Sequence, residues 1–224
     1  MGQANATIGA AGSLHSLSMD AHDTRADLHL SKRFFKATEW AAARHAISAD
    51  AEPGSRPSLG QVLGIASLVL EDGGTEREAI AAMLLDACGS EAVPLAELRS
   101  TFGKKTTKLV ALCAQARDDV EDRIERLGTD GDPSIRRVFA ADLLRELRAF
   151  VQDLRRTGSI AFARFSTPPS QQLDNYQLLV QVLTRLDPRG SLTQELRATF
   201  AEMQRLVELD TATAAWRVAH VDAA

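Results

Sequence analysis

The sequence predicts an all-α protein with no β-sheet, and three observations carry this prediction. From Ser31 onward, apolar residues recur three and four positions apart, which places them on one face of a helix. No window shows the sustained alternation of apolar and polar residues that is typical of a half-buried strand. No glycine-rich phosphate-binding loop follows a strand-like run, so a nucleotide-binding α/β fold is not indicated.

Glycine, proline and capping residues divide the chain into separate predicted helices. Thr75 followed by Glu78 three residues later is a capping-box pattern, which marks the start of a helix. Gly73, Gly74 and Gly89 are typical of helix ends. The predicted helices span residues 31–48, 58–70, 75–88, 94–102, 118–126, 134–156, 170–186 and 191–209, with a further helix through residues 109–113 after Gly103.

These helices predict one domain between two less regular ends. The domain spans residues 31–209. Residues 1–30 are rich in Gly, Ala, Ser and Asp with little periodicity, and we expect a flexible N-terminal tail there. Residues 210–224 are expected to form a C-terminal extension. Within the domain, the mixed charges of residues 117–126 predict a helix with a solvated face.

Composition narrows the classes of function. The chain has 224 residues, 45% of them hydrophobic, and a net charge of −4, which is typical of a globular protein. No basic cluster alternates with aromatic residues, so neither nucleic acid nor a membrane is the expected partner. No apolar run is long enough to span a membrane and no secretory signal is evident, so we expect a cytoplasmic protein. Cys88 and Cys113 lie in apolar helices without metal-site spacing and are predicted to be buried thiols.

Two acids stand out because each occurs alone on an apolar helix. Asp86 is the only acid in residues 79–90, the most apolar long run of the chain. Asp142 lies beside the apolar positions of the helix predicted at residues 134–156. A buried acid is costly unless it is paired, hydrogen-bonded or bound to a metal. Asp86 and Asp142 are therefore the leading candidates for a site.

The order of these motifs resembles the HD superfamily of metal-dependent phosphohydrolases, and within it the small alarmone hydrolases, which remove pyrophosphate from (p)ppGpp. The family motif Ala-Ala-Leu-Leu-His-Asp corresponds to residues 81–86, and the Phe-Gly pair that follows it corresponds to Phe102-Gly103. The later Lys-Leu-Ala-Asp motif is matched by residues 138–142, and the Pro-Pro before a Tyr-bearing helix by residues 168–169. The resemblance covers residues 34–207 and implies a compact multi-helix HD-domain bundle.

The resemblance also implies a metal site, but its ligand positions have changed in this chain. The family holds a divalent ion, typically Mn²⁺, with two histidines and two aspartates. The histidine positions correspond to Gln61, a weak neutral ligand, and Leu85, which cannot bind a metal. The aspartate positions are kept as Asp86 and Asp142. The resemblance therefore implies no resident cofactor, and Mn²⁺ or Mg²⁺ only if these two acids suffice to bind an ion.

Other positions that the family uses for chemistry have changed as well. The acid pair beside the attacking water corresponds to Gly89 and Ser90, which cannot act as a general base. The basic run that grips substrate corresponds to residues 49–52, where two acids would repel phosphate. For Arg145, the sequence leaves open whether it neutralises Asp142 or is solvated. The pocket candidates are His45, Glu91 and Arg145.

The resemblance and these replacements together favour a degenerate HD-domain protein, a pseudoenzyme with a binding, regulatory or interaction role. The alternative is a metal-dependent phosphohydrolase with a rebuilt site that acts on a nucleotide or another small phosphorylated substrate. The sequence leaves the partner open, whether a protein or a small molecule, and leaves homo-oligomerisation open as well.

Overall fold

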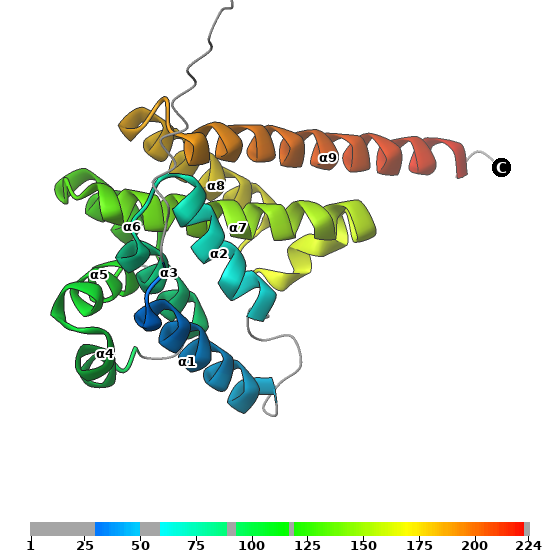
Figure 1. Ribbon diagram of the computed structural model, residues 1–224. Helices are drawn as coiled ribbons and strands as arrows, with labels where there is room; N and C mark the ends of the chain where they lie inside the picture. Colours follow the sequence, from blue (N-terminus) through cyan, green and yellow to red (C-terminus); the bar gives the residue numbers. More distant parts are fainter. Residues whose placement is uncertain (1–29, 50–58, 89–92, 117–118, 222–224) are drawn as a thin grey trace, which may run out of the picture.

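The computed structural model describes residues 30–49, 59–88, 93–116 and 119–221, and helices joined by short turns form these ranges (Figure 1). No strand occurs in these ranges, which confirms the predicted all-α class. The helices are α1 (Lys32–Ala49), α2 (Leu59–Glu71), α3 (Glu76–Cys88), α4 (Leu95–Phe102), α5 (Lys104–Ala114), α6 (Val120–Thr129), α7 (Pro133–Thr157), the 3-10 helix η1 (Gly158–Arg164), α8 (Pro169–Leu186) and α9 (Ser191–Val221). No helix in the described part of the chain is long and apolar enough to cross a membrane.

Helix α3 is the central element of the bundle. It packs against α1, α2, α5 and α7, and every residue from Glu78 to Cys88 is buried. A helix with neighbours on several sides must be apolar around its circumference, which explains why its sequence shows no single apolar stripe. Asp86 is therefore buried in the interior of the bundle, on a helix that packs against four other helices.

The start of α3 is formed by the predicted capping box. The amide and hydroxyl of Thr75 donate to Glu78 Oε2 at 2.6 and 2.7 Å, and the amide of Glu78 donates to Thr75 Oγ1 at 3.3 Å. These bonds satisfy amide groups that have no partner within the helix. Burial by itself would raise the pKa of Glu78, but the bonds from Thr75 and the charge of Arg137 hold that pKa below its ordinary value.

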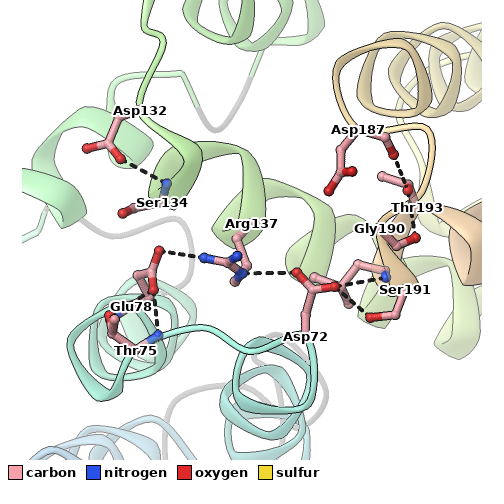
Figure 2. A network of polar contacts seen from close by, with 11 residues as sticks. Asp72, Thr75, Glu78, Asp132, Ser134, Arg137, Asp187, Gly190, Ser191 and Thr193 are labelled. Atoms are coloured by element: carbon pink, nitrogen blue, oxygen red, sulfur yellow. Dashed lines mark hydrogen bonds and ion pairs between the residues drawn. The ribbon is translucent and has the colours of Figure 1, made fainter. Parts of the chain in front are cut away.

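A polar network extends from this cap to three other elements (Figure 2). Arg137 on α7 donates through Nε to Asp72 Oδ2 at 2.9 Å and through Nη1 to Glu78 Oε1 at 2.8 Å. The other oxygen of Asp72 accepts from Ser191 Oγ at 2.6 Å and from the amide of Leu192 at 3.3 Å, at the start of α9. The turn between α2 and α3 is thus fastened to both α7 and α9.

The C-terminal part of the chain differs from the sequence expectation. The last helix was expected to end near residue 209, but α9 continues to Val221 and runs alongside α7 (Figure 1). The segment between α7 and α8 forms η1, which the sequence did not predict. Its Phe162 and the following Phe165 stack edge-on against Phe150 of α7, with ring centroids 4.9 and 5.1 Å apart. This long-range aromatic packing has no local pattern that would reveal it. The N-terminal tail expected at residues 1–30 lies, apart from its last residue, outside the described ranges.

Candidate functional site

The two acids that the sequence singled out are brought to one place by α3 and α7. Asp86 on α3 has a fully buried side chain, and that of Asp142 on α7 is 7% exposed. Between them lies the guanidinium of Arg145, whose Nη2 is 3.1 Å from Asp86 Oδ1 and 3.3 Å from Asp142 Oδ1. One nitrogen of a single arginine therefore contacts both carboxylates. We call these three residues the Asp–Arg–Asp cluster.

Arg145 is positioned by its own helix. It lies three residues after Asp142 on α7, the spacing that places two side chains on the same helix face. Its side chain is only 17% exposed. Burial would lower its pKa, but the charges of Asp86 and then Asp142 raise the pKa of Arg145 above its ordinary value. The guanidinium is therefore a permanent positive charge held between two acids, and of the two roles that the sequence left open, the structure shows the ion pair.

A second arginine reaches the same cluster from α6. Arg123 Nη2 lies 3.7 Å from Asp142 Oδ2, with the arginine side chain 8% exposed. Its guanidinium carbon also lies 5.3 Å from the centroid of the Phe139 ring, within the range of a cation–π contact. The expectation that this charged helix is solvated is therefore wrong at Arg123. The overlooked signal is Leu127, which lies four residues later and is buried on the same helix.

Beside Arg123, a cleft of about 280 Å³ opens between α6, α7 and α8. On its wall the hydroxyl of Tyr176 donates to Glu146 Oε1 at 2.6 Å. Burial first, and then the negative charge of Glu146, raise the pKa of Tyr176 well above its ordinary value, so the hydroxyl keeps its proton. Glu146 was not predicted from the sequence, although it lies four residues after Asp142 and next to Arg145.

Of the remaining predicted positions, two have side chains that the structure describes and four do not. Leu85 is 2% exposed and is part of the apolar core, and Gln61 is half-buried on α2. His45 lies on α1, but its side chain is outside the described part of the structure. Gly89, Ser90 and Glu91 also lie outside the described residues.

The described side chains do not fit the divalent metal that the resemblance implies. Among them, no group of three or more His, Cys, Asp or Glu residues is arranged to hold a metal ion. The two acids that remain already share the positive charge of Arg145, which would repel a second cation at the same place. The leucine at position 85 offers no lone pair to a metal.

Neither cysteine is suited to nucleophilic chemistry. Cys88 and Cys113 are both free and buried, as the sequence predicted. Burial first, and then the charge of Asp142, raise the pKa of the Cys113 thiol to about 12. A thiol that keeps its proton at neutral pH is a weak nucleophile.

The structure thus shows an all-helical bundle in which two buried aspartates lie on packed helices. The sequence matches the family described as the HD domain over residues 37–159, which is more than half of the chain. The chain therefore belongs to the HD domain family, as the resemblance implied. This match extends from α1 to the start of η1 and includes the whole cluster.

Two solved structures share the fold. The lmo0812 protein of Listeria monocytogenes EGD-e has a TM-score of 0.55 and 22% identity, covering 62% of this chain and 96% of that one. A metazoan orthologue of SpoT that hydrolyses ppGpp has a TM-score of 0.56 and 18% identity, covering 79% of this chain and 97% of that one. No curated protein matches the sequence significantly. At these identities the likeness concerns the fold alone.

Proposed function

We propose that this chain is a pseudoenzyme of the HD domain family, without hydrolase activity and with a binding or regulatory role. The observation that carries the proposal is the position of Arg145 Nη2, 3.1 Å from Asp86 and 3.3 Å from Asp142. Two buried acids need a positive charge, and here an arginine of the same chain supplies it. With Arg123 Nη2 also 3.7 Å from Asp142 Oδ2, two cationic side chains face the two acids, so the charges of the site balance without a metal ion.

An arginine does not replace the chemistry of a metal. A bound divalent ion lowers the pKa of a coordinated water and so makes a nucleophile at neutral pH. A guanidinium has only N–H donors and no site at which water could coordinate and ionise. Together with Leu85 at a ligand position and Gly89 and Ser90 at the positions of the general base, this argues against hydrolysis.

The alternative function, a metal-dependent phosphohydrolase with a rebuilt site, makes a structural demand. Arg145 would have to leave Asp86 and Asp142 before an ion could bind between them. Its side chain is mostly buried and its pKa is raised by these acids, so leaving would cost two ion pairs. We therefore retain the alternative only as an outcome of the test.

The test combines an activity assay with metal analysis. The purified chain is incubated with Mn²⁺ or Mg²⁺ and ppGpp, then with a panel of nucleotides, and the metazoan SpoT orthologue serves as the positive control because it hydrolyses ppGpp. We expect no release of pyrophosphate or phosphate and no stoichiometric Mn, Fe or Zn in the protein. Metal-dependent release that is abolished by Asp142→Asn would refute the proposal and establish the alternative.

A further inference from the structure

A second cleft, of about 460 Å³, lies at the other end of α3 from the Asp–Arg–Asp cluster. It is lined by Arg77 in the first turn of α3, whereas Asp86 follows nine residues later on the same helix. At 1.5 Å per residue this separates the two along the helix axis by about 14 Å. The cleft is thus a different place from the candidate site, and what it binds does not depend on whether the chain hydrolyses anything.

Three helices begin at this cleft. The first turns of α1, α3 and α5 contribute Arg33, Arg77 and Lys104 to its lining, and α3 packs against both of the other helices (Figure 1). The N-terminus of a helix carries a partial positive charge and unpaired amide groups. The dipoles of the three helices add a positive potential at this cleft, although amide groups at the starts of α1 and α3 are already bonded, to Ser31 and within the capping box.

The charged side chains strengthen this potential. Four cationic residues and one acid line the cleft. The acid, Glu76, is engaged at the start of α1, where it accepts from the amide of Ser31 at 3.0 Å and from its hydroxyl at 2.6 Å. The chain as a whole has a net charge of −4, so this cleft is a local excess of positive charge on an acidic protein. The cationic residues are Arg33, Arg77, Lys104 and Lys105.

The start of α5 is open toward a ligand. Its N-cap is Gly103, with φ of 82° and no side-chain hydrogen bond to the helix end. That φ lies in the region that favours glycine. A side chain there would also meet the Arg33 guanidinium, since an added Cβ would lie 3.0 Å from Arg33 Nη2. Glycine at this position therefore leaves the first amide groups of α5 without a competing cap.

An independent observation comes from Thr106, a buried polar residue on the wall of the cleft. Thr106 is only 4% exposed, yet its hydroxyl makes no hydrogen bond within the described part of the chain. The hydroxyl of its neighbour Thr107, by contrast, donates to the carbonyl of Gly103 at 3.0 Å. The Thr106 oxygen is not among the buried side-chain atoms that lack a partner, so it opens to the cleft that it lines and is available to a ligand there.

We infer that this cleft binds the phosphate group of a small phosphorylated molecule. A phosphate carries nearly two negative charges and several acceptor oxygens, which match the amide groups of α5, the hydroxyl of Thr106 and the cations of Arg77 and Lys104. The volume of about 460 Å³ exceeds that of a phosphate and is in the range of small-molecule pockets. The rest of the ligand therefore has room beside its phosphate.

The test uses inorganic phosphate and pyrophosphate as probes of the full chain, at constant ionic strength against chloride, by calorimetry and thermal shift. We expect 1:1 binding of pyrophosphate, and a loss of about tenfold in affinity in Lys104→Ala and in Arg77→Ala, since each removes a charge-assisted contact. Thr106→Val, which keeps the shape of the side chain, should lose several-fold. Lys108→Ala is the matched control, because this exposed lysine on α5 is not in the lining.

Two outcomes would overturn the inference. One is that neither probe binds the wild-type chain. The other is that Lys108→Ala weakens binding as much as Lys104→Ala, which would reveal attraction to the general charge of α5 rather than a site. Asp142→Asn separates this inference from the proposed function: binding that survives in this variant belongs to the cleft, and binding that is lost belongs to the Asp–Arg–Asp cluster.

Discussion

Replacing Arg145 by methionine removes the positive charge that Asp86 and Asp142 share, while keeping a side chain of similar length. The arginine is 17% exposed and contacts acids that are 0% and 7% exposed, so both carboxylates lose a partner in a place that water barely reaches. Breaking a buried ion pair in this way costs about 3–5 kcal/mol. We expect the lower end, about 3 kcal/mol, because Arg123 still lies 3.7 Å from Asp142.

The assay is chemical and thermal unfolding, with Arg148→Met as the matched control. Arg148 is on the same helix, but it is 43% exposed and pairs with Glu195 at the surface. A surface pair contributes less than about 1 kcal/mol. For a chain of this size, 3 kcal/mol corresponds to a fall in Tm of about 6–12 °C, so the two variants should be clearly separated.

The pH dependence distinguishes a charge effect from a packing effect. Without Arg145, burial penalises the ionised form of the acids, so the folded variant binds a proton more readily than the unfolded chain does. Stability must then recover as pH falls, and the gap between Arg145→Met and wild type should be smaller at pH 5 than at pH 7.5. A gap that is the same at both values, or an equal loss in Arg148→Met, would refute the reasoning.

The remaining predictions concern the capping box, the turn before α5 and the buried thiols. Glu78→Gln should lower the free energy of unfolding in urea by about 3 kcal/mol, since it weakens the pair with Arg137. Because the pKa of Glu78 is lowered in the folded state, the stabilisation by its carboxylate is present above the ordinary carboxyl pKa and is lost as pH falls through the native pKa. The variant should therefore lose less stability than wild type on acidification. An unchanged acid profile would count against this assignment. Gly103→Ala should destabilise by about 1–2 kcal/mol, since φ is 82°, whereas Gly128→Ala on α6, which meets nothing within 4 Å, should not. With a pKa of about 12, the Cys113 thiol should stay unmodified by an alkylating reagent at pH 8 until denaturant is added; modification at the rate of a free thiol would contradict its burial.

Helix boundaries were predictable from the sequence because the signals that set them are local. The bonds between Thr75 and Glu78 that begin α3 join residues three apart, and Gly73, with φ of 74° and open space around it, needs only its own backbone freedom to end α2. The prediction failed where distant residues decide the outcome. Distant residues decide two such features: Phe162 of η1 packs on Phe150, and α9 contacts α7.

The sequence alone determined the helical class, the order of the helices, and the identity of the residues at the HD motif positions, including Leu85 and Asp86. It could not tell which of many arginines is buried, because a charged residue on an amphipathic helix looks the same whether it faces water or a second helix. Only the tertiary structure placed Arg145 between Asp86 and Asp142, and only it gathered three helix starts around Thr106. The physical reason is that ion pairs, and the combined field of several helix ends, depend on distances in space. Those distances are set by how the other helices pack against α3.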